Sequence, residues 1–122
     1  MEYCSEVERR LHSPERVAAV GTPVAPIVTG EAEDRTLNVW VRYLIQLRGE
    51  VIDSVRFGAY GCPHFVAAAD WHAEQLEGRR SVALAEPDTA GVREALDVPT
   101  EKLGKLLVIE NALAACARAV AA

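Results

Sequence analysis

The sequence contains few cysteines and no closely spaced pair of them. Its three cysteines, Cys4, Cys62 and Cys116, form an odd and widely spaced set, and no Cys-x-x-Cys pair occurs among the 122 residues. Such a set argues against a disulfide framework and gives a self-contained zinc site little local support. The thiols are therefore expected to be free for metal or redox chemistry.

Clusters of positive charge and long apolar runs are also missing. Thirteen basic residues are scattered among 18 acidic ones, which gives a net charge of −5 and argues against nucleic acid as a partner. No stretch approaches the roughly 18 apolar residues of a membrane span, and the first residues contain no apolar segment of the signal-peptide kind. We therefore expect a cytoplasmic protein that binds neither nucleic acid nor membrane.

In other respects the composition is that of an ordinary globular protein, because half of the residues are apolar and a quarter are charged. No internal repeat or low-complexity run interrupts it. A chain of 122 residues is long enough to bury one core. We predict a single domain over residues 1–122.

Local patterns predict a helix, then a small antiparallel sheet, then further helices. Residues 3–12 have apolar side chains four positions apart, whereas residues 18–35, with two glycines and two prolines, have the composition of an irregular connector. From residue 36 to 48 apolar and other side chains alternate with a period of two, which predicts a strand. A turn near Gly49 and a second strand over residues 51–60 complete a hairpin. This order is typical of the α+β class.

A helix is predicted to begin at Pro63 and to end at Gly78. Ser81 is expected to cap a short helical turn, and Thr89 a helix that runs through residue 96. Thr100 is expected to cap the last helix, whose apolar stripe includes one glutamate and consists of Leu103, Leu106, Leu107, Glu110, Leu113 and Ala114.

Cys62 lies at the start of the predicted helix, between Gly61 and Pro63. Proline suits the first helical position, so Cys62 should lie among the unsatisfied backbone N–H donors of the helix N-terminus. That place favours a thiolate. The alternative is that Cys62 is a small buried residue that is retained for packing.

His64 follows two positions after Cys62, so the pair could supply two metal ligands, with Asp34 or Glu33 as a third. The alternative is a histidine on the surface of the first helical turn. Other candidates have a plainer interpretation: we expect solvated side chains at His12 and His72, packing or interface residues at Trp40 and Trp71, and core filling by Cys4 and Cys116.

Several segments together resemble the U-type scaffolds of iron–sulfur cluster assembly, which include the N-terminal domain of NifU and its IscU relatives. Tyr3 and residues 13–17 (Ser-Pro-Glu-Arg-Val) resemble that family's opening tyrosine and its Asn-Pro-Arg-Asn-Val segment. Residues 51–62 follow its second strand and its Phe-x-x-x-Gly-Cys motif without a gap. Residues 78–82 and 98–103 resemble its Gly-Lys-Ser-Leu turn and its Leu-Pro-Pro-Val-Lys segment. The resemblance implies a three-stranded antiparallel sheet packed against helices, as in the SufE/NifU-like fold.

The sequence departs from this family at two of the three cysteines that bind the [2Fe-2S] cluster. Residues 30–36, where the first is expected, contain no cysteine, although Asp34 preserves an acid. The family's His-Cys pair falls on Gly104 and Lys105, so the resemblance puts an ammonium group where a thiolate would face Cys62. We expect Lys105 to pair with the Cys62 thiolate.

The resemblance therefore implies a scaffold-like protein with a degenerate ligand set. It would bind iron, zinc or a [2Fe-2S] cluster weakly through Cys62, Asp34 and His64, or handle sulfur through Cys62. Cysteine desulfurase or other iron–sulfur assembly proteins are the implied partners, with a homodimer as a further option, and no enzymatic turnover is expected. The alternative is a non-catalytic interaction module that keeps the scaffold fold and its docking surface. Docking of the family's chaperone is weakened because Glu101 interrupts the proline segment around Pro99 and Lys102.

Overall fold

The structure, a computed structural model, describes residues 27–121. The predicted helix over residues 3–12, together with Cys4 and His12, lies outside the described residues. The described elements, in chain order, are β1 (Ile27–Asp34), β2 (Val39–Arg48), β3 (Val51–Tyr60), α2 (Pro63–Leu76), the 3₁₀ turn η1 (Ser81–Ala85), α3 (Thr89–Ala95), the 3₁₀ turn η2 (Thr100–Lys102) and α4 (Leu103–Ala121).

The three strands form one antiparallel sheet in the order β1-β2-β3, which confirms the predicted α+β class and the predicted hairpin. Alternate residues of β2 are buried, beginning with Val39, Val41 and Tyr43, as the period of two requires. The hairpin turns at Gly49, whose φ of +62° is in the left-handed region that glycine tolerates.

The prediction of an irregular connector over residues 18–35 is wrong for residues 27–34, which form β1. Gly30 interrupts this segment, and glycine ordinarily weakens a strand. Here the glycine lets α4 approach the sheet, because an added Cβ would lie 2.6 Å from Sγ of Cys116 and would also meet the carbonyl oxygen of Ala112. The second strand begins at Val39 rather than at residue 36, because residues 35–38 form the turn after β1.

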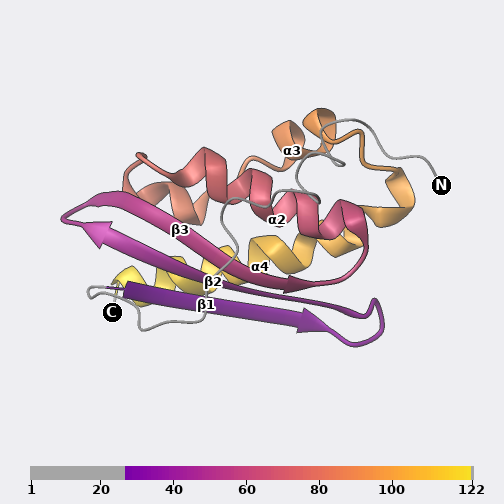
Figure 1. Ribbon diagram of the computed structural model, residues 1–122, viewed down its shortest axis with the longest axis horizontal. Coiled ribbons are helices and arrows are strands. Elements are labelled where there is room, and N and C mark those ends of the chain that lie inside the picture. The colour runs from indigo at the N-terminus through magenta and orange to yellow at the C-terminus, as the bar shows by residue number, and fades with distance from the viewer. Residues whose placement is uncertain (1–26, 122) are drawn as a thin grey trace.

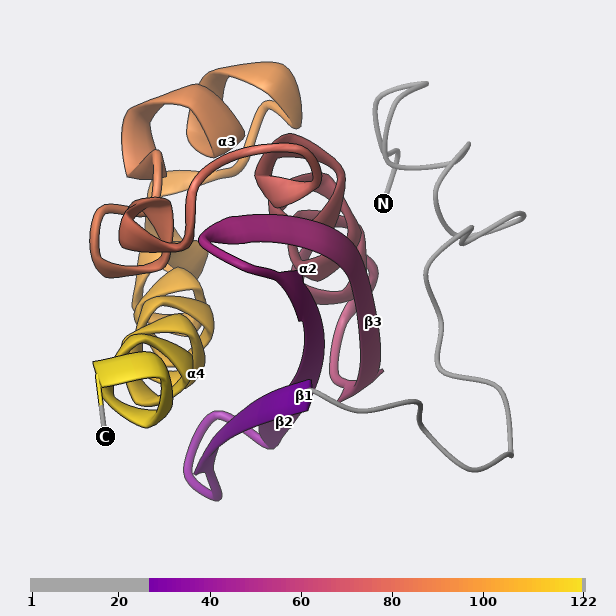
Figure 2. The same ribbon diagram turned by 90° about the vertical axis from the view of Figure 1, so that its left-hand side faces the viewer.

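Helices α2 and α4 cover the same face of the sheet, as the two views together show (Figures 1 and 2). Helix α4 packs mainly on β1 and β2, and α2 packs on β3. The core between the layers is built around Tyr43, Phe57 and Phe65, whose side chains are fully buried. The hydroxyl group of Tyr43 donates a hydrogen bond of 2.8 Å to the carbonyl oxygen of Ala69, which joins β2 to α2.

The buried face of α4 differs from the predicted stripe. Leu106 and Leu113 are buried as expected, and so is Cys116, but Leu107 is 58% exposed and the buried face is completed by Val108, Ile109 and Ala112. The face is rotated because the sheet and α2 together surround a wider arc of the helix than one stripe covers. None of the helices within residues 27–121 is long and apolar enough to cross a membrane.

Two predicted caps are displaced by one residue. Helix α3 begins at Thr89, but its cap is Asp88, whose Oδ1 accepts a hydrogen bond of 2.8 Å from the N–H of Gly91. Residue Ser81 begins η1 rather than capping it. By contrast, α2 begins at Pro63 as predicted, and Gly78 follows its end with a φ of +85°.

Candidate functional site at the start of α2

Three connecting segments meet at one end of the molecule, on the right in Figure 1: the β1–β2 turn, the β3–α2 junction and the η2–α4 junction. The start of β2, directly after the first segment, is close to the second, because a Cβ added at Gly61 would lie 2.9 Å from Cγ1 of Val39. The first and third are also adjacent, because a Cβ at Gly104 would lie 3.8 Å from Cδ1 of Leu37. Cys62 belongs to the middle segment.

Cys62 is the N-cap residue of α2, as its position before Pro63 predicts. Its backbone is extended (φ −71°, ψ 164°), and its carbonyl oxygen accepts hydrogen bonds from the N–H groups of Phe65 (3.0 Å) and Val66 (3.1 Å). The side chain makes no capping bond, and the free thiol is half-buried. The sulfur therefore takes no part in holding the helix start, and part of the residue is open to solvent.

His64 lies in the first turn of α2 but is only 4% exposed, so the expectation of a surface histidine is wrong. Its Nδ1 lies 3.0 Å from Nζ of Lys102. Burial, and then the charge of Lys102, lower the pKa of His64, while Asp97 acts in the opposite direction. A neutral imidazole accepts a hydrogen bond from the ammonium group at Nδ1, so this nitrogen is engaged by the protein itself.

The lysine that contacts this helix start is Lys102 rather than Lys105. Lys105 is half-buried in the first turn of α4, and its charge also lowers the pKa of His64. Among the hydrogen bonds of residues 27–121, none joins Lys105 to Cys62. Pairing of Lys105 with the Cys62 thiolate is therefore not supported by a direct contact.

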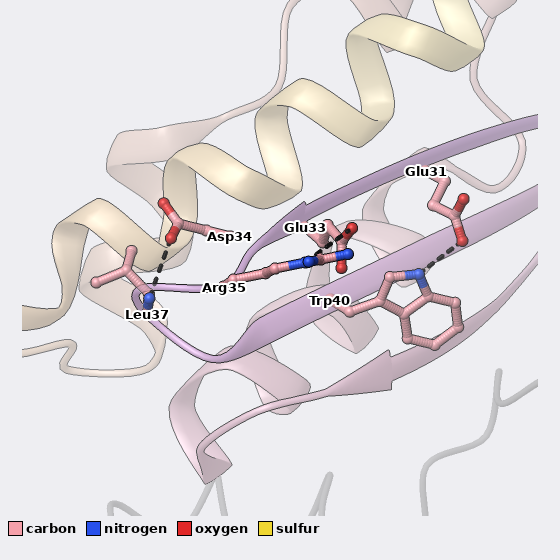
Figure 3. A network of polar contacts seen from close by, with 6 residues as sticks. All are labelled: Glu31, Glu33, Asp34, Arg35, Leu37 and Trp40. Atoms are coloured by element: carbon pink, nitrogen blue, oxygen red, sulfur yellow. Dashed lines mark hydrogen bonds and ion pairs between the residues drawn. The ribbon is translucent and has the colours of Figure 1, made fainter.

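Asp34 stabilises the turn that follows β1. Its Oδ1 accepts a hydrogen bond of 3.0 Å from the N–H of Leu37, and Asn38 completes the turn with a φ of +59° (Figure 3). Within residues 27–121, no three His, Cys, Asp or Glu side chains are grouped closely enough to hold a metal ion. The expected set of Cys62, Asp34 and His64 is therefore not assembled as a metal site in this part of the chain.

His72 is also placed differently from its expectation, because it is 3% exposed rather than solvated. Its ring lies edge-on to Trp71, with 5.2 Å between ring centroids. Burial lowers the pKa of His72 to about 4, and the charge of Asp88 only partly opposes this. Trp71 and Cys116 are buried packing residues, as predicted.

Sequence reasoning missed the pair of His64 and Lys102, whose members are 38 residues apart and share no local pattern. It also missed the role of Asp34 in the turn, although a signal was present. Asp at the start of a tight turn and Asn at its left-handed position are the residues that such turns favour, and residues 34–38 read Asp-Arg-Thr-Leu-Asn.

The fold and the thiol together define a small α+β protein that presents one cysteine where three connecting segments meet. No protein-family model matches the chain. It is 32% identical over 98 residues to the bifunctional protein NifU/MnmA of Rubrobacter xylanophilus, covering 80% of this chain but only 20% of that relative. The chain thus spans about a fifth of the length of the curated relative that it matches.

Solved structures show the same fold. A protein described as an iron–sulfur cluster assembly scaffold for the SUF system, from Fervidobacterium islandicum AW-1, matches with a TM-score of 0.73 at 14% identity, over 94% of this chain and 96% of that one. The N-terminal part of a NifU-like protein from Brucella abortus matches with a TM-score of 0.55 at 17% identity, over 96% of this chain and 81% of that one. The two structures show that the chain has the fold of these scaffolds, and the NifU/MnmA match shows that it is similar in sequence to part of a NifU-containing protein.

Proposed function

We propose that the protein acts in cytoplasmic iron–sulfur cluster assembly as a scaffold-like protein whose working group is the Cys62 thiol. It carries sulfur or a cluster as cargo and is not an enzyme with turnover of its own. The observation that supports this most directly is the half-buried, free thiol of Cys62 at the junction of three connecting segments. The NifU name of the curated relative and the scaffold description of the SUF-system structure support the pathway.

Transfer of sulfur is the chemistry that a single thiol supports best. A [2Fe-2S] cluster normally requires about four protein ligands. Residues 27–121 provide no group of three suitable side chains, and Nδ1 of His64 is engaged by Lys102. A cluster, iron or zinc bound through Cys62 would therefore take further ligands from a second protein, from a second copy of the chain or from Asp34 after the turn has rearranged. A persulfide needs only the one sulfur.

The proposed step is a thiol–persulfide exchange. The Cys62 thiolate attacks the terminal sulfur of a persulfide on a donor cysteine, such as that of a cysteine desulfurase. A new S–S bond forms on Cys62 while the donor's S–S bond breaks, and the donor cysteine leaves as a thiolate. One sulfur atom moves with no net oxidation or reduction, so no further co-reactant is needed.

The test is the mass of the protein after incubation with a cysteine desulfurase and cysteine. We expect the full chain to gain one sulfur atom, reversible by a thiol reductant, and Cys62→Ser to gain none. Cys4→Ser and Cys116→Ala serve as matched controls and should gain sulfur like the unaltered chain. If the unaltered chain gains no sulfur, or if Cys62→Ser gains as much, transfer through Cys62 is excluded.

The second candidate is an interaction module without thiol chemistry. This candidate is favoured because the expected ligands near Cys62 already make structural contacts: His64 is paired with Lys102, and Asp34 closes a turn. For this function, Cys62→Ser should bind the desulfurase as tightly as the unaltered chain, and neither should carry persulfide. Metal and acid-labile sulfide in protein purified without oxygen would instead support cluster binding.

A further inference from the structure

A row of three side chains crosses the sheet on the face that α2 and α4 leave uncovered. Glu33 of β1 lies opposite Trp40 of β2, which in turn lies opposite Tyr60 of β3. Trp40 belongs to this face because it alternates with the buried Val39 and Val41. Tyr60 is 60% exposed, and Glu33 is exposed as well. A carboxylate and two aromatic rings are thus brought together from three strands.

The indole ring of Trp40 is held in one orientation. Its Nε1 donates a hydrogen bond of 2.6 Å to Oε2 of Glu31, one row along the sheet (Figure 3). The ring extends over Gly58, where an added Cβ would lie only 3.2 Å from Cη2 of Trp40. Glycine at this position lets the ring lie against the backbone of β3. The aromatic surface is therefore organised before any ligand arrives, which lowers the entropic cost of binding.

The chemistry of this row fits a planar cation. An indole ring attracts a cation through the negative face of its π-system, and a guanidinium group also stacks flat on the ring and pairs with a carboxylate. Glu33, Asp34, Trp40 and Tyr60 line one shallow hollow at this edge of the sheet, together with Arg35, Asn38 and Val39. Glu33 has an ion pair of 3.9 Å with Arg35, but both side chains are largely exposed, so an incoming arginine can replace it at little cost.

We propose that Glu33, Trp40 and Tyr60 form a docking surface for an arginine side chain of a partner protein. The hollow has two carboxylates against the one guanidinium group of Arg35, and this excess and the net charge of −5 are complementary to such a partner. Tyr60 precedes Cys62 by two residues, so a partner anchored here is also close to the segment that carries the thiol. In this respect the inference rests on the proposed function, because the arginine-bearing partner is the protein that exchanges sulfur or a cluster with Cys62.

The direct test is an NMR titration of the full chain with the blocked tripeptide acetyl-Gly-Arg-Gly-amide. We expect saturable shifts of the Trp40 indole N–H and the Tyr60 ring, and none at Trp71, which is buried elsewhere. The lysine counterpart should bind about fivefold more weakly or worse, since an ammonium group does not stack. If the arginine peptide produces no saturable shift, docking of a protein-borne arginine is excluded.

Variants separate the docking surface from general charge effects. Glu33→Gln and Trp40→Leu should each weaken binding of the peptide several-fold. Asp53→Asn, which removes an exposed carboxylate from the far end of β3, should not. Equal effects of Glu33→Gln and Asp53→Asn would contradict the proposal even if Trp40→Leu failed to fold. Cys62→Ser should bind the peptide normally, so failure of sulfur transfer and failure of arginine docking give different results.

Discussion

At the scale of single residues, surroundings rather than residue type decide what a group can do, as the two described cysteines illustrate. Burial in the core raises the pKa of the Cys116 thiol to about 12, so this sulfur stays protonated and unreactive near neutral pH. Cys62 is half-buried at a helix start, where part of the residue is open to solvent. This difference makes Cys116 the structural cysteine and Cys62 the candidate for chemistry.

Replacing either of two glycines by alanine should change the free energy of unfolding, but in opposite directions. At Gly30, a Cβ would lie 2.6 Å from Sγ of Cys116, so Gly30→Ala must push α4 away from β1. We expect a loss of about 1–3 kcal/mol in the free energy of unfolding, as for other overpacked sites. At Gly104, in the first turn of α4, the nearest atom would be 3.8 Å away. Gly104→Ala should therefore stabilise the protein by up to about 1 kcal/mol, because alanine favours the helix.

Urea denaturation of the two variants beside the unaltered chain measures both effects. A Gly30→Ala variant as stable as the unaltered chain would show that α4 does not approach β1 as closely as the structure indicates. A destabilised Gly104→Ala variant would show that the start of α4 is tightly packed.

At the scale of elements, α3 depends on its cap because it is only seven residues long. Asp88 satisfies the N–H of Gly91, and Asp88→Ala should lower the free energy of unfolding by about 1 kcal/mol. Thermal or urea unfolding near pH 8, where the nearby His72 is neutral in both states, isolates this contribution. Glu86→Ala is the matched control, since the Glu86 side chain is exposed and the residue ends η1 only through its backbone N–H, which alanine keeps, so the change should have little effect. Equal losses in both variants would exclude the cap as the cause.

The elements that could be predicted from the sequence are those whose signals lie within a few neighbouring residues. The β2–β3 hairpin and the start of α2 were predictable because alternation, a turn glycine, and a proline after Cys62 are signals within a few residues. Strand β1 was not, because Gly30 is explained only by the distant helix that packs on it. The exposed Leu107 was unpredictable for the same reason, since the packing partners of α4 decide which residues of the helix are buried.

At the scale of the whole molecule, the candidate site was predictable only in part. The position of Cys62 at a helix start follows from its neighbours in sequence. The contact between His64 and Lys102 does not, because η2 and α2 are brought together by the packing of α4 against the sheet and α2. The resemblance to U-type scaffolds supplied the fold and the end of the molecule where Cys62 lies. The contacts made at the positions where the family's ligands are replaced could be known only from the structure.

Two buried histidines make the stability of the whole fold dependent on pH. His72 has a pKa of about 4 in the folded protein against 6.5 when unperturbed, and burial lowers the pKa of His64 as well. Between about pH 4 and pH 6.5, the unfolded chain binds a proton at His72 that the folded protein does not. The stabilising contribution of neutral His72 is therefore complete above about pH 6.5 and is lost as the pH falls towards about 4.

The expected loss from His72 alone is about 3 kcal/mol over this interval. It is measured as the difference between the unaltered chain and His72→Gln in urea unfolding at a series of pH values. Glutamine does not titrate, so the variant should be less stable near pH 8 but should lose less stability on acidification, whereas carboxylate protonation affects both proteins alike. Parallel curves from about pH 6.5 to about 4 would mean that His72 accepts a proton in the folded state, and hence that the packing between Trp71 and Asp88 admits charge.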